Sequence, residues 1–130
     1  MKAFHLIMLV LVPMAVSLQH VEAISDQNDQ VMQNTWMTSV NKQIQLVADV
    51  TNKQDTTLPF VYIIQVKDSQ DKAVSLTWIT GSLQPHQSMS PAQSWIPTKA
   101  GVYTAQIFVW ESIEGGPAWS EPLEMKIIAT

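Results

Sequence analysis

The sequence contains no cysteine. This absence excludes disulfide bonds, a lipid-modified N-terminal cysteine, a thiol nucleophile and a cysteine-containing blue-copper site. The fold must therefore be stabilised by its hydrophobic core, which a domain of about 100 residues can achieve without covalent cross-links.

Arginine is also absent, so lysine supplies all seven basic side chains, against eleven carboxylates. Phosphate backbones are usually bound by clustered cations, often through the bidentate guanidinium group of arginine. We therefore expect no nucleic-acid partner. The formal net charge of −4 is mild and says more about solubility than about partners.

Reactive groups are scarce beyond the first 23 residues. One histidine remains, His86, in the turn-like stretch LQPHQS, and no G-x-S-x-G motif occurs. A lone histidine among serines makes neither a catalytic triad nor a metal site. Asp68 and Asp71 in KDSQDK are typical of a hairpin turn, with a calcium site as the minor alternative. We predict a non-enzyme with no cofactor and no metal.

Residues 1–23 have the pattern of a secretory signal peptide. Lys2 precedes an apolar run, and VEA at 21–23 offers small or apolar residues at the −3 and −1 positions of a cleavage site. Cleavage after Ala23 is preferred, and cleavage after Ser17 is the second choice. A membrane anchor is the alternative, but a spanning helix needs about 20 apolar residues and this run is shorter. The pattern predicts a secreted or cell-surface protein, with no membrane span after cleavage.

The rest of the chain divides into a polar segment and one domain. Residues 24–34 are rich in Gln, Asn and Asp without periodicity, which indicates a tail or linker. From a first strand near TWMTSV (35–40), residues 35–130 alternate apolar and polar positions in short runs between Pro, Gly and Asp turns. This pattern predicts an all-β fold, an immunoglobulin-like antiparallel β-sandwich of about seven strands, with a small closed barrel as the alternative.

The stretch SWIPTKAGVYTAQIFVW (94–110) predicts a corner between two sheets. In immunoglobulin-like sandwiches, a tyrosine near the start of the sixth strand binds upstream backbone with its hydroxyl while its ring fills the core. Tyr103 occupies such a position, Gly101 would permit a tight turn before it, and Trp95 would cover the end of the core. We therefore expect these three residues to be structural.

Placing this tyrosine in the core predicts an apolar patch on the other side of its strand. Because side chains alternate along a strand, Phe108 and Trp110 should point outward from the strand of Tyr103. By the same alternation, Val61 and Ile63 should point outward from the third strand. Because the third and sixth strands of such a sandwich are neighbours, these four residues form the candidate interaction face.

Three arrangements of this face remain open, because a soluble monomer rarely leaves such a patch bare. The chain covers it with TWMTSV or with the loop that carries Trp119; or a partner binds it; or a bulge inverts the assignment of inward and outward residues.

The strands and the corner together resemble a group of immunoglobulin-like domains, close to CARDB-like adhesion modules, found in exported proteins of ammonia-oxidising archaea. The resemblance covers about residues 43–130 and rests on Trp78 with Gly81, Trp95 with Pro97, Ala100-Gly101, Tyr103, and Ile107 to Trp110. It implies an extracellular or surface-associated β-sandwich with no active site and no cofactor. The corner pattern W-x-P…G-x-Y is also similar to that of proteinase-inhibitor β-sandwiches.

Three functions are compatible with these observations. The first is a non-catalytic interaction module that binds a protein or glycan partner through the candidate interaction face or through edge strands. The second is a structural subunit of an extracellular assembly, which donates NTWMTSVNKQ as a strand to a neighbouring copy. The third is an accessory subunit of an outward-facing membrane complex.

Overall fold

The computed structural model describes the backbone of residues 16–24 and 35–130, and the side chains of residues 35–130. Within these residues the secondary structure consists of strands, and no helix long and apolar enough for a membrane span is found there. The strands are β1 (Val16–Ile24), β2 (Thr35–Thr38), β3 (Ile44–Asn52), β4 (Leu58–Lys67), β5 (Ala73–Leu83), β6 (Ser88–Met89), β7 (Ala92–Trp95), β8 (Gly101–Ser112), β9 (Gly115–Ala118) and β10 (Leu123–Ala129).

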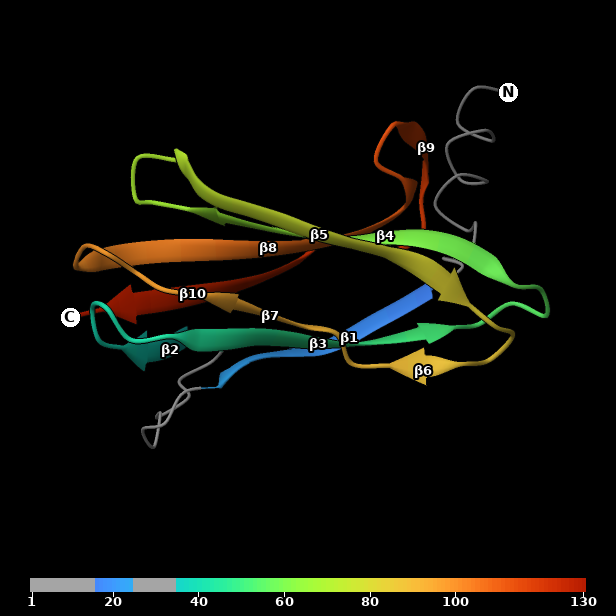
Figure 1. Ribbon diagram of the computed structural model, residues 1–130, viewed down its shortest axis with the longest axis horizontal. Coiled ribbons are helices and arrows are strands. Elements are labelled where there is room, and N and C mark those ends of the chain that lie inside the picture. The colour runs from blue at the N-terminus through green and yellow to red at the C-terminus, as the bar shows by residue number, and fades with distance from the viewer. Residues whose placement is uncertain (1–15, 25–34) are drawn as a thin grey trace, which may run out of the picture.

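The strands form two open sheets packed as a sandwich, which confirms the predicted fold class (Figure 1). The small sheet has the order β1-β3-β6, and β7 also pairs with β3. The large sheet has the order β2-β10-β8-β4-β5, and β9 also pairs with β8. The pairs are antiparallel except β2 with β10, which is parallel. The alternative of a closed barrel is wrong for the described residues, because β2 and β5 end the large sheet without pairing with each other.

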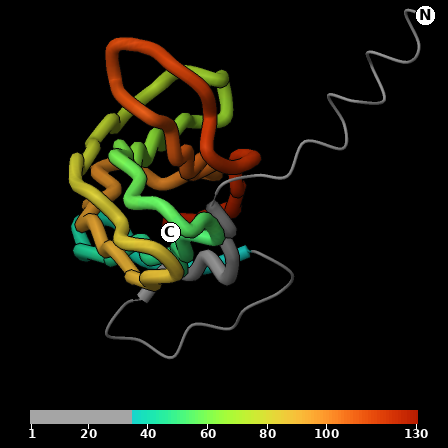
Figure 2. The backbone as a smooth tube through the Cα atoms, turned by 90° about the vertical axis from the view of Figure 1, so that its right-hand side faces the viewer, coloured from blue at the N-terminus to red at the C-terminus, as the bar shows by residue number. Residues whose placement is uncertain are grey.

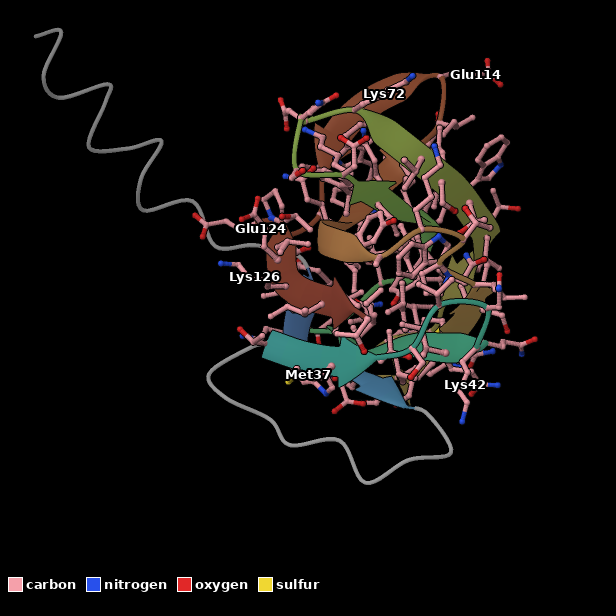
Figure 3. All side chains as sticks on the ribbon, turned by 90° about the vertical axis from the view of Figure 1, so that its left-hand side faces the viewer. Met37, Lys42, Lys72, Glu114, Glu124 and Lys126 are labelled. Atoms are coloured by element: carbon pink, nitrogen blue, oxygen red, sulfur yellow. The ribbon has the colours of Figure 1, made fainter. Side chains whose placement is uncertain are left out.

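The core lies between the two sheets and follows the predicted period of two. The strands β3, β4 and β8 turn alternate side chains inward, where they are buried. The inward sets are Ile44, Leu46, Ala48 and Val50 on β3; Tyr62, Ile64 and Val66 on β4; Tyr103, Ala105, Ile107 and Val109 on β8. The view along the strands shows side chains filling the space between the sheets (Figure 3). The inward and outward assignment of these strands is therefore confirmed.

The predicted signal peptide and polar segment lie mostly outside the described residues. Within this full-length chain, however, Val16–Ile24 forms β1 and pairs antiparallel with β3. Cleavage after Ala23 would remove almost all of β1, whereas cleavage after Ser17 would keep the pairs from Leu18 with Val50 to Ile24 with Gln45. Processing itself stays a prediction.

A chain that begins at Leu18 should be more stable than one that begins at Ile24. The longer chain keeps the main-chain hydrogen bonds of β1 on the edge of β3, and each such bond contributes about 0.5–1.5 kcal/mol net. The free energy of unfolding of both chains, measured by urea denaturation, checks this expectation. Equal values would mean that β1 adds nothing to the folded domain.

Tyr62 is the largest fully buried side chain of the core. Its hydroxyl lies 3.5 Å from the carbonyl oxygen of Pro91, at the weak limit of a hydrogen bond. Burial raises the pKa of the Tyr62 phenol above its ordinary value of about 10, because the phenolate would lose its hydration inside the sandwich.

This burial predicts alkaline sensitivity. Because the folded pKa of Tyr62 lies above the unfolded one, its neutral form stabilises the fold fully below about pH 10, and this stability is lost as the pH rises further. The loss for this one group is about 1.4 kcal/mol per pH unit. Urea titrations between neutral pH and pH 11 should show a steeper loss for the wild-type chain than for Tyr62→Phe. Parallel pH profiles would contradict the assignment.

Candidate interaction surface

The four residues of the candidate interaction face do share one face of the large sheet. Val61 lies directly opposite Trp110, and Ile63 directly opposite Phe108, in the antiparallel pairing of β4 with β8. The rings of Phe108 and Trp110 pack with their centroids 5.6 Å apart. This is the face turned away from the core, because the neighbouring Tyr62 and its partner Val109 point inward. No bulge inverts the assignment here.

The strand β5 extends this face by two residues that the sequence argument did not place there. Trp78 lies opposite Ile63, and Leu76 lies opposite Gln65, so both side chains point to the same side as the four residues. We call the six residues together the outer apolar surface: Val61, Ile63, Leu76, Trp78, Phe108 and Trp110. The alternation of Leu76 and Trp78 was visible in the sequence, but their neighbours were not.

The outer apolar surface has a buried floor and exposed rims. Val61 is 0% exposed and Ile63 is 4% exposed, because larger side chains on the flanking strands cover them. At the rims Trp110 is 36% exposed, Trp78 51% and Leu76 54%. Two indoles and an aliphatic side chain are therefore presented to solvent on a firmly packed base.

The tryptophans of the two segments expected to cover this surface both pack against the core instead. Trp36 of β2 is buried in the core, and β2 lies at the far edge of the large sheet, beyond β10. Trp119 packs against the core, where its indole N–H donates a 2.6 Å hydrogen bond to the carbonyl oxygen of Pro59. Figure 2 shows the loop around β9, in orange-red, projecting beyond the sandwich. The hypothesis that TWMTSV covers this face is therefore wrong, whereas cover by the rest of the loop that carries Trp119 stays a prediction.

The predicted corner has the expected contacts. The Tyr103 hydroxyl donates a 2.6 Å hydrogen bond to the carbonyl oxygen of Lys99, four residues upstream. Trp95 packs edge-on against the Tyr103 ring, with centroids 4.9 Å apart and planes at 72°. Because Trp95 belongs to the small sheet and Tyr103 to the large one, this contact joins the two sheets at the corner. Gly101 is the first residue of β8 and has a φ of +157°, a positive value that residues with a side chain rarely adopt, so the chain enters β8 in a conformation that favours glycine.

A cleft of about 500 Å³ opens beside this corner. It lies between the turn that joins β4 to β5 and the loop that joins β7 to β8. Trp95 and Tyr103 contribute aromatic surface, and Lys72 and Lys99 contribute positive charge. Sequence reasoning did not find this cleft, because its two walls are about 30 residues apart in the chain and meet only through the β4–β8 pairing.

The aspartates considered for calcium serve the β4–β5 turn. One carboxylate oxygen of Asp68 accepts hydrogen bonds from the backbone N–H groups of Gln70 and Lys72, at 2.9 and 3.0 Å. Asp71 has a left-handed φ of 63° and pairs with Lys67 at 3.4 Å. In the part of the chain that the structure describes, no three metal-ligating side chains gather.

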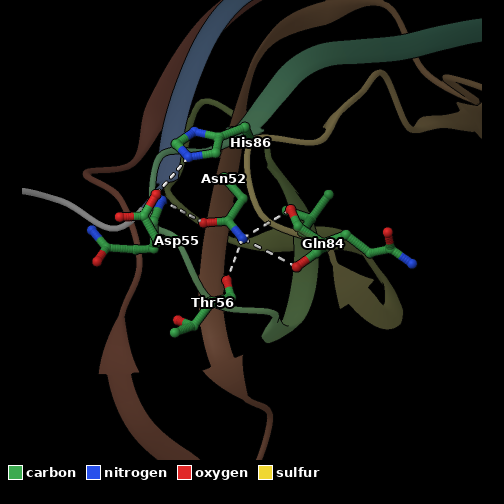
Figure 4. Close-up of polar contacts among 7 residues, drawn as sticks. Asn52, Asp55, Thr56, Gln84 and His86 are labelled. Carbon is green, nitrogen blue, oxygen red and sulfur yellow. Dashed lines mark hydrogen bonds and ion pairs between the residues drawn. The ribbon is translucent and has the colours of Figure 1, made fainter.

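The largest polar network lies around Asn52, at the opposite end of the sandwich (Figure 4). The Asn52 side-chain nitrogen lies within 2.9–3.1 Å of the carbonyl oxygens of Thr56, Leu83 and Gln84, and its oxygen accepts a 2.8 Å hydrogen bond from the N–H of Gln54. The side chain is fully buried. It therefore holds the β3–β4 turn to the end of β5.

His86 lies at the rim of this network (Figure 4). Its Nε2 lies 2.7 Å from a carboxylate oxygen of Asp55, and both side chains are largely exposed. Within residues 35–130 no third reactive group is bonded to this exposed pair, so no triad-like arrangement forms around His86 there.

No protein-family model matches this sequence, and no curated protein matches it. Solved structures do match, at identities that show the fold alone. The C-terminal domain of wzt is 12% identical over 91% of this chain and 75% of that domain, with a TM-score of 0.66. A β-glucosidase from Erythrobacter marinus also matches, with a TM-score of 0.59, but the chain spans only 16% of that enzyme.

The CARDB domain of the PF1109 protein from Pyrococcus furiosus has the same fold. Its solution structure is 18% identical over 91% of this chain and 98% of the domain, with a TM-score of 0.59. The chain described here is thus a CARDB-like β-sandwich, as the sequence resemblance implies. An archaeal origin remains a prediction.

Proposed function

We propose that this chain is an exported, non-catalytic β-sandwich module that binds a protein or glycan partner through its outer apolar surface. The observation that carries the proposal is the exposure of Trp78, Trp110 and Leu76 above the buried Val61 and Ile63. Exposed apolar patches on a soluble domain mark interaction sites, and tryptophan is enriched among the residues that dominate binding energy.

The shape of the surface also favours binding. Its two indoles stand on a sheet whose floor is packed as tightly as a core, so little side-chain freedom remains to be lost in a complex. An indole presents a broad apolar face and one N–H donor, which suits either a protein side chain or the apolar face of a sugar ring.

The non-catalytic part of the proposal is supported by the placement of the reactive groups. His86 and Asp55 form an exposed pair, and Asp68 and Asp71 are engaged in their turn. The export part is supported by the N-terminal pattern of residues 1–23. The intact mass of the protein recovered from the producing cells tests export directly, since cleavage removes a defined N-terminal segment.

Replacing Trp110 with alanine should weaken partner binding much more than it lowers the stability of the fold. With a third of the residue already exposed, the substitution should cost about 1–2 kcal/mol of folding free energy. Binding to the isolated cell envelope of the producing organism, measured by co-sedimentation, should fall at least about tenfold.

The matched control is Ile96→Ala, which removes an equally accessible apolar side chain from the loop after β7. This variant should bind the envelope as the wild-type chain does. If Trp110→Ala binds normally, or if Ile96→Ala loses binding equally, the outer apolar surface is not the binding site.

The alternative of a subunit that donates its N-terminal segment has less support. Thr35–Thr38 pairs with β10 of its own chain, and Trp36 is buried in its own core. An accessory subunit of a membrane complex has no specific observation in its favour.

A further inference from the structure

The large sheet ends in one long edge that the chain leaves open. Among the described residues, β5 pairs with β4 on one side, and no strand pairs with its other side. Its backbone therefore presents a row of unpaired N–H and C=O groups along Ala73–Leu83. In Figure 3, Lys72 beside β5 and Met37 on β2 lie at opposite ends of the molecule, as the strand order requires.

Among the described sheet edges β5 is the longest. The next longest is β1, the 9-residue edge of the small sheet, whose sequence includes Glu22 and whose pairing with β3 shifts register between Gln19 and Glu22. At the other end of the large sheet, β2 has only 4 residues, and in the small sheet β6 has 2 and β7 has 4. β5 has 11 residues, AVSLTWITGSL, without a charge or a proline to block pairing. Its one irregularity is a bulge at Val74, near its beginning, which leaves Ser75–Leu83 in regular register with β4.

β5 carries exposed bulky apolar side chains on both faces, among serines and threonines. Leu76 and Trp78 point to the outer side, whereas Ile79, opposite the core residue Tyr62, points to the inner side and is still 39% exposed. A solvated antiparallel edge normally carries polar side chains on its exposed face. An edge strand with apolar side chains on both faces and free hydrogen-bonding groups is suited to adding another strand.

We propose that β5 pairs antiparallel with β5 of a second copy of this chain, about a two-fold axis at Trp78, so that the large sheet continues across the dimer. This inference goes beyond the proposed function, because it assigns the edge and its occupant, while the outer apolar surface as a whole remains the site for a different partner.

Steric complementarity favours a second copy as the occupant. With the axis at Trp78, Leu76 of each copy faces Thr80 of the other, and Ile79 faces Thr77, so each bulky aliphatic side chain meets a smaller one. The two Trp78 indoles then lie opposite each other, in the aromatic pairing that stabilises antiparallel sheets. This axis also keeps both outer apolar surfaces on one side of the continuous sheet.

Charge gives a second argument. Each copy carries a formal net charge of −4, so a self-interface must keep carboxylates away from its centre. The edge from Ala73 to Leu83 contains none. The interface consists of one strand and a few side chains, so it is among the small protein–protein interfaces. We therefore expect a dissociation constant of the dimer on the order of 10 μM.

Cysteine cross-linking tests the pairing and its register, since the wild-type chain has no cysteine of its own. Directly opposed residues on antiparallel strands have Cα atoms about 4.5–5.5 Å apart, within the reach of a disulfide. On mild oxidation, a mixture of Leu76→Cys and Thr80→Cys chains should form a covalent dimer, whereas either variant alone should not. Trp110→Cys, two strands away from the edge, should form no covalent dimer.

Light scattering over a dilution series provides the second measurement. Ile79→Lys puts a charge into the pairing edge without touching the outer apolar surface, and should raise the dissociation constant of the dimer at least about tenfold. Val102→Lys, at a similarly exposed aliphatic residue of β8, is the control and should leave the dimer intact. Circular dichroism checks that both variants fold.

Two outcomes overturn the pairing, and a third separates it from the proposed function. If the wild-type chain stays monomeric far above 10 μM and the mixed Leu76→Cys and Thr80→Cys chains form no disulfide, the edge is empty or belongs to another protein. Cross-linking of Trp110→Cys with equal efficiency would mean association through the sheet face, which would leave the proposed function standing. Loss of envelope binding by Trp110→Ala with an intact dimer would separate the two proposals.

Discussion

Replacing Asn52 with leucine should lower the free energy of unfolding by about 3–5 kcal/mol, one of the two largest effects expected for a single substitution in this chain. The leucine side chain has a similar volume but offers neither a donor nor an acceptor. Three carbonyl oxygens, those of Thr56, Leu83 and Gln84, would lose the amide donor that now lies within 3.1 Å. The N–H of Gln54 would lose its acceptor as well.

The measurement is urea denaturation followed by tryptophan fluorescence. Thr51→Val is the matched control, since Thr51 is the preceding residue on β3 and its hydroxyl makes an exposed hydrogen bond with Ser88. This control should change stability by less than about 1 kcal/mol. A loss of similar size in both variants would contradict the role given to the Asn52 network.

Replacing Trp36 with alanine should be comparably severe, at about 3–5 kcal/mol. Trp36 is 5% exposed and belongs to the core cluster, and its strand β2 is held only by parallel pairing with β10. Removing the indole takes away the main packing contact of a four-residue strand, so we expect β2 to detach.

Met37→Ala is the control for this prediction, because Met37 is the next residue of β2 and is 46% exposed. It should cost well under 1 kcal/mol. If both substitutions are equally mild, β2 is not part of the chain's own core, and donation of this segment to a neighbouring copy becomes the better account.

Periodicity predicted what depends on a strand and its own two faces. The alternation in β4 and β8 was enough to place Tyr62 and Tyr103 inside and Ile63 and Phe108 outside, because a pleated strand leaves no third choice. The tyrosine corner was predictable for a similar reason, since its hydrogen bond spans only four residues.

Features that depend on distant segments were not predictable. The Asn52 side chain joins turns that are about 30 residues apart, and nothing in the local sequence DVTNKQ distinguishes it from an ordinary turn asparagine. Likewise, Trp78 joins the outer apolar surface only because β5 pairs with β4 in one particular register. The open edge of β5 is a property of the strand order, which alternation does not specify.

The central claim is that the outer apolar surface is occupied in the native setting of the protein. Hydroxyl-radical footprinting of Trp78 and Trp110 tests it most directly, with the buried Trp36 as the internal reference. Oxidation should be high for both residues in the dilute purified protein and strongly reduced for both on the producing cells. Protection of Trp78 alone would support the paired edge without a partner on the face. Equal oxidation in the two settings would contradict the account, because the surface would then be bare where the protein works.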